Sequence, residues 1–286
     1  MVSGIQKEKA EKFLKYHRDK EILVLLNSWD IGSSKLVEAC GYRAIATTSM
    51  GISASLGYPD CQVIQLSEMI DIIRGIVNAV QAPVTVDIEA GYGNNVNEII
   101  ESVKKIIAAG IVGINIEDSL ELHPALIDEM EFCERISAIR SLSDSLGFHL
   151  VINARTDSFY VTSGSQQEKL SESIRRGNKY REAGADCIFV QPVSDRKLIS
   201  TLVNEINAPV NILSNPGFGA GMPPSVQELQ DMGVTRLSLG SSLMKASFAL
   251  IKKVADELSE KGTYKILSET MTPLSDAALA YKMAIR

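Results

Sequence analysis

Aromatic and basic residues are too scarce in this chain to support several common functions. The 286 residues include one Trp and only 6% aromatic residues, which leaves no stacking platform for single-stranded nucleic acid. The 29 Lys and Arg are outnumbered by 35 Asp and Glu, and the net charge of −6 argues against a basic surface for nucleic acid or membranes. No apolar run approaches the ~20 residues that span a bilayer. We therefore expect neither nucleic acid nor a membrane as a partner.

Cysteine and histidine are also few and scattered. The three histidines are too far apart for a zinc site, and the four cysteines have neither metal-type spacing nor a histidine partner in a nucleophile motif. The first 20 residues are polar and charged, unlike a secretory signal. These features predict a reduced, cytoplasmic protein. With 45% hydrophobic and 22% charged residues, the chain has the composition of an ordered globular protein.

Short apolar runs alternate with longer amphipathic segments along most of the chain. Eight runs recur about every 30 residues, the length of one βα unit, and several are apolar at nearly every position, as in a buried parallel sheet. We predict strands over residues 22–26, 44–48, 84–88, 113–117, 149–153, 187–191, 209–213 and 235–239. We predict helices over residues 66–80, 96–109, 129–146, 168–183 and 195–206.

Eight such units predict an α/β fold, a (β/α)8 TIM-type barrel, with an open doubly wound sheet as the alternative. No Gly/Ser-rich linker divides the chain, so residues 1–286 form a single domain in this interpretation. The segment after the last predicted strand exceeds one helix. We expect extra C-terminal helices there, with about residues 261–286 as an extension used in oligomerisation.

Polar and acidic residues follow several predicted strands, at the end of the barrel where active sites of this fold lie. Asp87 and Glu89 are two residues apart on one strand, so their side chains point the same way, and Glu117 and Asp118 end the next strand. Converging carboxylates repel one another and suffer desolvation, which a hard cation with oxygen ligands relieves. The pattern predicts a Mg²⁺ site; the alternative is that these acids face solvent or pair with Lys and Arg.

Arg155 is the one basic residue among these strand ends. Its guanidinium could hold a substrate carboxylate through two N–H bonds, or form an ion pair with Asp157 or Glu117, and the two roles can coexist. The Thr-Ser-Met-Gly segment at 48–51 could present backbone N–H groups to an anion.

Weaker candidates lie elsewhere along the chain. His123 follows the fourth predicted strand and could approach the site, whereas His149 opens a strand at the opposite end and is expected to be structural. The glycine-rich residues 217–221 and residues 240–242 could form a phosphate-binding site, with a flexible loop as the alternative.

Five segments resemble the isocitrate lyase/phosphoenolpyruvate mutase superfamily, and together they extend over most of the chain. They are AIATTSMGISASLGYPD at 44–60, VTVDIEAGYGN at 84–94, GINIED at 113–118, NARTD at 153–157 and AGAD at 183–186. The resemblance implies a barrel that binds Mg²⁺, with Mn²⁺ as a substitute, and acts on 2-oxo acids through a pyruvate enolate. It also implies a homo-oligomer, a dimer or a tetramer with helix exchange.

Carried over by position, the resemblance implies roles for individual residues. Asp87 would be the direct metal ligand, and Asp60, Glu89 and Glu117 would hold metal-bound waters. Arg155, Asp60 and Glu117 would be catalytic. The substrate would be bound by Asp87 together with residues from other strand ends: Ser49, Met50, Gly51, Arg155 and Gln191.

The sequence departs from this family in the loop after the fourth predicted strand. Members that cleave isocitrate or methylisocitrate carry a K-[KR]-C-G-H motif there, whose cysteine serves as an acid/base. Here residues 117–136 read EDSLELHPALIDEMEFCERI, with Cys133 in a helical pattern. The Lys and Asn of the mutase-type loop are absent too, and Glu89 stands where many members have Asp.

These departures favour a Mg²⁺-dependent lyase or decarboxylase acting on an oxaloacetate-like 2-oxo acid. A C–C or P–C hydrolase, or a phosphonomutase-like enzyme of the same superfamily, is the first alternative. Two further alternatives are a barrel enzyme for a phosphorylated sugar or heterocycle, and a non-catalytic barrel that binds a 2-oxo acid.

Overall fold

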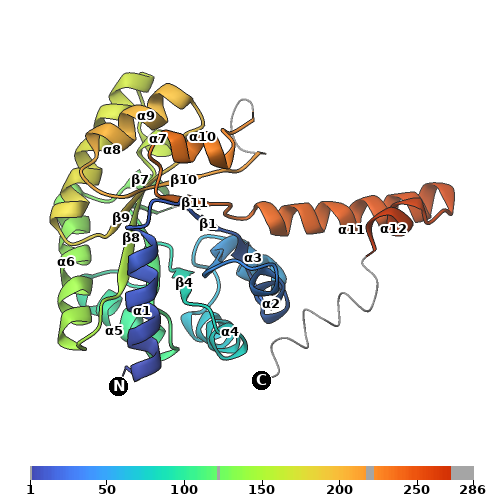
Figure 1. The fold of residues 1–286 in the computed structure, drawn as a ribbon, viewed down its shortest axis with the longest axis horizontal. Coiled ribbons are helices and arrows are strands. Elements are labelled where there is room, and N and C mark those ends of the chain that lie inside the picture. The colour runs from blue at the N-terminus through green and yellow to red at the C-terminus, as the bar shows by residue number, and fades with distance from the viewer. Residues whose placement is uncertain (1, 121–122, 217–221, 272–286) are drawn as a thin grey trace.

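Eight parallel strands close into a barrel in the computed structural model, which describes residues 2–120, 123–216 and 222–271 (Figure 1). The first strand is interrupted at Leu26: its first half pairs with the last strand and its second half with the next strand, and this closes the ring. The predicted TIM-type barrel is therefore confirmed. In chain order the barrel strands are β1 (Leu23–Leu25), β2 (Asn27–Ser28), β3 (Ile45–Thr47), β4 (Val84–Asp87), β5 (Gly113–Glu117), β8 (Val151–Thr156), β9 (Cys187–Val190), β10 (Val210–Leu213) and β11 (Arg236–Ser238).

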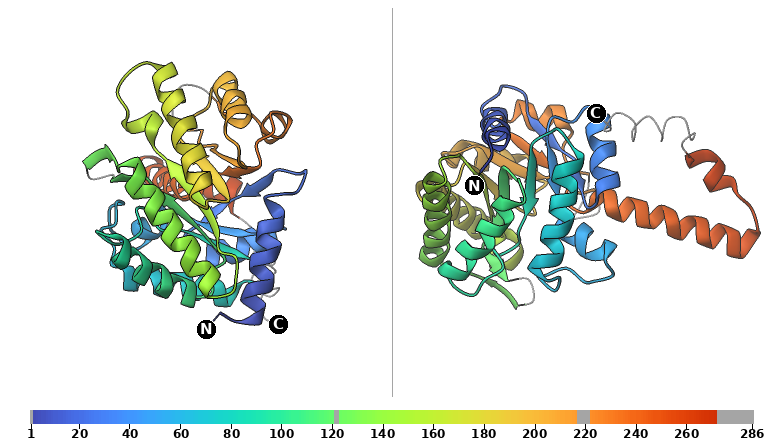
Figure 2. Two further views of the ribbon diagram at one scale, coloured as in Figure 1. Left: turned by 90° about the vertical axis from the view of Figure 1, so that its left-hand side faces the viewer. Right: turned by 90° about the horizontal axis from the view of Figure 1, so that it is seen from below.

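Helices form an outer layer around this sheet (Figures 1 and 2). Several begin at a side chain that accepts hydrogen bonds from first-turn amides, as Asn95, Ser165 and Asp195 do. All five predicted helices are present within two residues of their expected ends. The helices between the first and last strands are α2 (Ile31–Ala39), α3 (Ser49–Ser55), α4 (Leu66–Ala79), α5 (Val96–Ala108), α6 (Glu129–Ser145), α7 (Ser158–Val161), α8 (Gln166–Glu182), α9 (Arg196–Glu205) and α10 (Val226–Asp231).

Two local predictions need correction. The strand predicted at 149–153 is β8, which starts at Val151 and ends at Thr156, because the Leu150 N–H donates to the Ser143 hydroxyl (2.9 Å) instead of joining the sheet. The region after β5 also contains an unpredicted antiparallel hairpin, β6 (Ser119–Leu120) and β7 (His123–Leu126).

An unpredicted N-terminal helix, α1 (Gly4–Tyr16), packs against the amino-terminal end of the barrel. Its Gln6 Nε2 donates to the carbonyl oxygens of Ile107 (2.9 Å) and Ile111 (2.8 Å). Phe13 is fully buried, and a Cβ at Gly113 would lie 2.7 Å from its ring. The missing side chain at Gly113 therefore lets α1 dock against β5.

Several barrel strands have an aliphatic outer face and a polar inner face, whereas the inner positions of β1, β3 and β9 are mostly apolar. Outward-facing positions are aliphatic and at most 1% exposed: Val86, Ile114, Ile152, Ile188 and Ile212. Inward-facing positions share one register, in which Asp87 pairs with Asn115 and Asn115 with Asn153. Barrel interiors are usually filled by Val, Ile and Leu. This interior instead buries Asn115, Asn153, Asn211 and Arg236.

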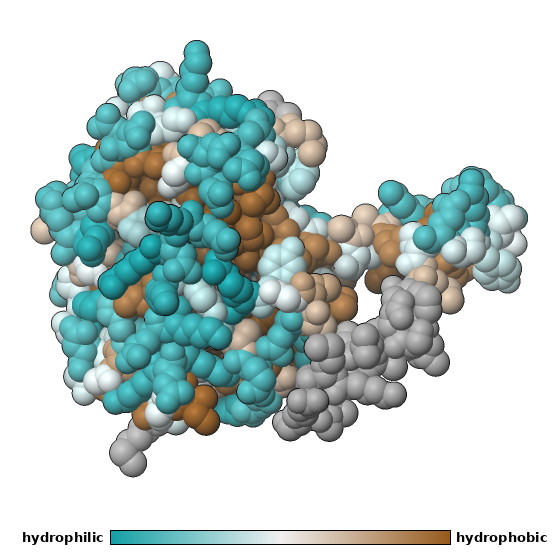
Figure 3. All heavy atoms as spheres, viewed as in Figure 1, coloured by the Kyte–Doolittle hydropathy of each residue, from teal (hydrophilic) through white to brown (hydrophobic). Residues whose placement is uncertain are grey.

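Helix α11 (Ser242–Lys261) projects away from the barrel and is followed by α12 (Lys265–Thr270), as the red segments of Figures 1 and 2 show. Several apolar residues of this arm are exposed: Phe248, Leu250, Ile251 and Leu258. Figure 3 shows brown, apolar surface among polar atoms on the arm. Residues 272–286, most of the predicted extension, lie outside the described residues. None of the helices in the described part of the chain is long and apolar enough to cross a membrane.

Candidate active site

The carboxyl-terminal ends of the strands surround a cavity of about 310 Å³, the size of a small-molecule site. Six residues predicted from the sequence line it: Ser49, Met50, Asp60, Asp87, Arg155 and Gln191. Three others, Gly51, Glu89 and Glu117, are buried outside this lining. The structure thus brings six of these nine residues together around one cavity.

Three carboxylates from two loops form an acidic cluster at one side of the cavity. Burial raises the pKa of Asp87, while the Arg155 charge and hydrogen bonds from the Ser49 hydroxyl (3.1 Å) and backbone N–H (3.4 Å) oppose the rise. Burial, and then the charges of Asp87 and Asp60, raise the pKa of Glu89 to about 8. The cluster therefore resists full ionisation near neutral pH unless positive charge joins it.

The two loops that carry these acids contain strained backbone. Among the described residues, positive φ at non-glycine positions occurs only at Cys61 (79°), Gln62 (55°), Glu89 (49°) and Tyr92 (54°). The loops are bonded together, because the Gln62 N–H donates to Glu89 Oε2 (2.6 Å) and the Tyr92 N–H donates to Gln62 Oε1 (2.8 Å). The Tyr92 hydroxyl also donates to Glu89 Oε1 (3.1 Å). Such conformations persist where the surroundings impose them, and they cluster at functional sites.

The donor set suits a cation that keeps much of its water shell. Within residues 2–120, 123–216 and 222–271, no three His, Cys, Asp or Glu side chains are grouped closely enough to hold a metal ion by themselves. Mg²⁺ is commonly held by one or two carboxylates, with waters and substrate oxygens in its remaining positions. Asp87 as a direct ligand, with Asp60 and Glu89 holding metal-bound water, is compatible with this arrangement. A bound cation would also favour the ionised form of Glu89.

Arg155 is held by two carboxylates. Its Nη1 pairs with Glu117 Oε2 (2.5 Å), and its Nε and Nη2 donate to Asp157 Oδ1 (2.7 Å) and Oδ2 (2.8 Å). Although burial opposes the charged form, Asp157 and Glu117 raise the pKa of Arg155. The structural ion pair considered for this residue is present, and it occupies one bidentate edge of the guanidinium. The Nε and Nη2 edge of the guanidinium faces Asp157, and Nη1 faces Glu117.

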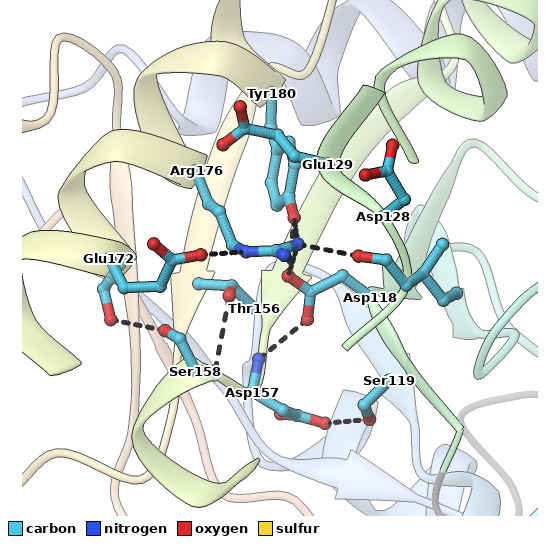
Figure 4. Close-up of polar contacts among 12 residues, drawn as sticks. Asp118, Ser119, Asp128, Glu129, Thr156, Asp157, Ser158, Glu172, Arg176 and Tyr180 are labelled. Atoms are coloured by element: carbon cyan, nitrogen blue, oxygen red, sulfur yellow. Dashed lines mark hydrogen bonds and ion pairs between the residues drawn. The ribbon is translucent and has the colours of Figure 1, made fainter. Parts of the chain in front are cut away.

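Asp118 is fully buried in a polar network with residues of α8 (Figure 4). Its Oδ2 accepts from the Tyr180 hydroxyl (2.5 Å) and from Arg176 Nη1 (3.2 Å), and its Oδ1 accepts from the Asp157 N–H (2.9 Å). Ser119 donates to Asp157 Oδ2 (2.5 Å). The expectation that Asp118 joins the converging carboxylates was wrong, since successive residues at a strand end face opposite sides. Through Asp157, the network anchors Arg155.

The segment after β3 reaches the cavity as the first turn of α3. The side chain of its N-cap, Thr48, makes no capping hydrogen bond. A Cβ at Gly51 would lie 2.8 Å from the Trp29 Cβ, so glycine is needed for this close packing. On the opposite wall, Gln191 Nε2 donates to Asp157 Oδ1 (3.1 Å), which orients its amide.

Several cavity residues were missed by the sequence reasoning: Asn27, Asn115, Tyr160, Ser238 and Lys245. Asn115 and Ser238 could have been found from the two-residue alternation within β5 and β11, which places polar side chains on the inner face. Lys245 brings a positive charge from α11 to the wall, and no motif marks it.

The weaker candidates have different outcomes. His149 Nε2 lies 2.7 Å from Asp186 Oδ1, in a cluster that also holds Arg140, so its structural role is confirmed. The His123 side chain and residues 217–221 lie outside the described part of the structure.

Comparison with known proteins gives consistent matches. Residues 13–259 match the family described as phosphoenolpyruvate phosphomutase. An uncharacterized protein of Mycobacterium tuberculosis is 33% identical over 225 residues, 79% of this chain and 80% of the relative. The 2-methylisocitrate lyase of Escherichia coli is 28% identical over 258 residues, 87% of this chain and 84% of the lyase.

Solved structures agree with these matches. A Burkholderia cenocepacia protein provisionally described as a lyase/mutase superposes with a TM-score of 0.88 at 30% identity, over 97% of this chain and 96% of that one. The fold is shared with phosphonopyruvate hydrolase in complex with oxalate and Mg²⁺, at 21% identity and a TM-score of 0.80, over 96% and 95% of the two chains. With the barrel and the acidic residues at its mouth, these matches show that the chain belongs to the phosphoenolpyruvate mutase/isocitrate lyase superfamily, a group of Mg²⁺-dependent lyases, hydrolases and phosphomutases that act on small 2-oxo acids.

Proposed function

We propose that this protein is a Mg²⁺-dependent lyase that decarboxylates an oxaloacetate-like 2-oxo acid. The observation that carries the proposal is the acidic cluster of Asp87, Glu89 and Asp60 beside the anchored Arg155, at the mouth of a cavity of about 310 Å³. The clustered carboxyl groups ionise fully only when a cation balances their charge. The guanidinium beside them suits an anionic substrate. The family membership supports the same chemistry.

In this proposal the chain supplies binding and orientation. Asp87 would ligate Mg²⁺ directly, and Asp60, Glu89 and Glu117 would hold metal-bound waters. When bound, Mg²⁺ would supply a Lewis acid that stabilises negative charge on the substrate oxygens. Arg155, Gln191 and the segment Ser49, Met50 and Gly51 would hold the substrate carboxylate, so that the breaking bond is aligned with the developing π system. Arg155, Asp60 and Glu117 would thereby act directly at the reaction centre.

The reaction breaks the C3–C4 bond of oxaloacetate, releases CO₂ and leaves its electron pair in the enolate of pyruvate, which takes a proton at C3. This chemistry needs no cysteine acid. Cys133, the cysteine nearest in sequence to the loop after β5, lies in α6 with a half-buried side chain. Burial and the neighbouring Glu129 raise the pKa of its thiol. Isocitrate or methylisocitrate cleavage through a loop cysteine is therefore not part of the proposal.

A hydrolase is the second candidate, since phosphonopyruvate hydrolase shares the fold and binds oxalate with Mg²⁺. Hydrolysis of the C2–C3 bond of oxaloacetate would give oxalate and acetate, whereas decarboxylation gives pyruvate and CO₂. A phosphonomutase-like reaction would rearrange the P–C bond of a phosphonopyruvate, which a ³¹P spectrum would show. Mg²⁺-dependent binding without turnover of any 2-oxo acid would indicate a non-catalytic barrel.

Two measurements test the proposal. Calorimetry with Mg²⁺ and oxalate, a planar analogue of the enolate, should show binding that a chelator removes and Asp87→Ala weakens by more than about 100-fold. Proton NMR of oxaloacetate turnover should show pyruvate forming faster than with Asp87→Ala protein at the same Mg²⁺ concentration, which corrects for metal-catalysed decarboxylation in solution. If the chelator left the oxalate affinity unchanged, the proposed metal site would be wrong.

We also propose that the protein is a homo-oligomer built through the arm formed by α11 and α12. The arm leaves the barrel while exposing apolar side chains, such as Ile251 at 66%. An apolar stripe of this kind on a projecting helix is best buried by another surface, and a second copy with helix exchange supplies one. Sedimentation should give a dimer or tetramer at micromolar concentration, and Ile251→Asp should shift it toward monomer. A monomeric wild-type protein would refute this.

A further inference from the structure

A buried arginine lies inside the barrel without an acidic partner among the described residues. Arg236, at the start of β11, is fully buried. Its Nη2 donates to Asn115 Oδ1 (2.9 Å), its Nη1 lies 3.4 Å from His17 Nε2, and its Nε has no hydrogen-bond partner in the described structure. Its guanidinium carbon is 6.0 Å from the centre of the Phe13 ring. A buried charge with such sparse compensation costs stability, which raises the question of what it does.

The contact with Asn115 has a consequence for the cavity. A guanidinium can only donate hydrogen bonds, so the Asn115 atom that faces Arg236 must be the amide oxygen. The same oxygen accepts from Asn153 Nδ2 (2.8 Å). Because this oxygen accepts from both Arg236 and Asn153, a flipped amide would leave both donors with no acceptor. The orientation of the Asn115 side chain is thus determined by chemistry.

The other end of this amide is turned toward the site. Asn115 is only 6% exposed and lines the cavity, and its neighbour in the register on β4 is Asp87. Its Nδ2 donates to no acceptor in the described residues, and it is not among the fully enclosed polar atoms that lack a partner. It is therefore an N–H donor group on a nearly buried side chain that lines the cavity.

We propose that Asn115 is a substrate-binding residue that donates a hydrogen bond from Nδ2 to an oxygen of the bound 2-oxo acid, and that Arg236 is the positioning residue that holds this amide from below. The inference rests on the proposed function for the nature of the ligand. The polar interior would thereby contribute to specificity. The Asn115 Nδ2 group would recognise an oxygen acceptor next to Asp87, and Arg236 would set the direction of that donor.

Asn115→Asp tests this with little risk to folding. The carboxylate keeps an acceptor for Asn153 and gives Arg236 an ionic partner, so the melting temperature should be unchanged or higher. The donor in the cavity becomes an acceptor, and oxalate binding in saturating Mg²⁺ should weaken about 10- to 100-fold. Asn211→Asp is the matched control, because Asn211 is buried in the same interior and bonds to Ser238 without lining the cavity.

Arg236→Met tests the positioning role. It should weaken oxalate binding about 3- to 10-fold in the wild-type background and cause no further loss in the Asn115→Asp background, since both changes act on one donor. Mg²⁺ binding without oxalate is measured in each variant, and oxalate affinity is compared at saturating Mg²⁺, so that an altered charge beside Asp87 is separated from loss of the donor. Wild-type oxalate affinity in Asn115→Asp, or an equal loss in Asn211→Asp, would overturn the inference and leave the proposed function standing. A wild-type protein that neither binds oxalate nor converts a 2-oxo acid would overturn both.

Discussion

The two faces of strand β8 bury side chains of very different polarity. On β8, Ile152 faces the helices and Asn153 and Arg155 face the interior, and all three are largely buried. The outer face is packed with aliphatic side chains whose removal from water favours folding. The inner face buries amides and charges, which cost free energy unless hydrogen bonds replace the lost water. The outer face therefore accounts for stability, and the inner face needs another explanation.

Incomplete hydrogen bonding on the inner face supports this distinction. Three of its buried polar atoms have no partner in the described structure: Thr85 Oγ1, Asn153 Oδ1 and Arg236 Nε. Natural proteins pair most buried polar atoms, and exceptions are informative. These three lie beneath the acidic cluster on the strands that carry Asp87, Arg155 and Ser238.

Arg155→Lys is expected to have the largest effect of a conservative inner-face change. A lysine ammonium cannot bind Glu117 while also occupying both oxygens of Asp157, so the substrate-facing geometry should be lost. Turnover of the 2-oxo acid should fall by about 10- to 100-fold. Steady-state kinetics with a parallel melting curve checks this. Wild-type turnover in a folded variant would show that the guanidinium is structural only.

Ile152→Ala is the matched outer-face change on the same strand. It removes a fully buried side chain and should lower the free energy of unfolding by about 2–5 kcal/mol. Oxalate affinity should change little, because the side chain faces the helices. Urea unfolding and calorimetry measure the two quantities on one sample. If Ile152→Ala lowered oxalate affinity as well as the free energy of unfolding, the outer face would also contribute to ligand binding, contrary to this prediction.

The amino-terminal end of the interior should respond to acid through His17. Burial, and then the Arg236 charge, lower the pKa of His17 to about 4. Between pH 6.5 and 4 the unfolded chain binds the proton and the native state does not, so this residue makes stability fall as the pH falls. The contribution is roughly 3 kcal/mol over this pH range.

The test compares the wild type with His17→Gln, which keeps a donor for the Phe13 carbonyl and an acceptor for Arg236. Urea unfolding at pH 7 and pH 4.5 should show a smaller loss of stability in the variant. Equal losses in both proteins would mean that His17 is protonated in the native state.

Cys133→Ser should have the smallest effect. The thiol lies on α6, outside the cavity lining, and its pKa is raised, so it is a poor acid/base at neutral pH. Turnover and oxalate affinity should remain within about twofold of the wild type, because the substitution is small and lies outside the cavity lining. A folded variant without activity would restore the cysteine-lyase interpretation.

Much of the fold could be predicted because its signals are local. The apolar runs and the 30-residue repeat predicted the barrel, and caps such as Asn95 and Asp195 fit the helix starts. The acidic residues after β4 and β5 were predicted to cluster because parallel strands end at one edge. The prediction for Asp118 was wrong. Strand β5 ends at Glu117, and the Asp118 side chain turns outward to Tyr180.

The sequence by itself determined the eight-unit barrel, the acidic strand ends and the missing cysteine loop, because these are patterns of neighbouring residues. Only the tertiary structure decided which partners the charges take. Arg155 lies between Glu117 and Asp157, and Arg236 orients Asn115 from 121 residues away. The docking of α1 and the projection of α11 also depend on long-range packing. Electrostatic and hydrogen-bonding partners are set by distances in space, and spacing along the chain does not encode those distances.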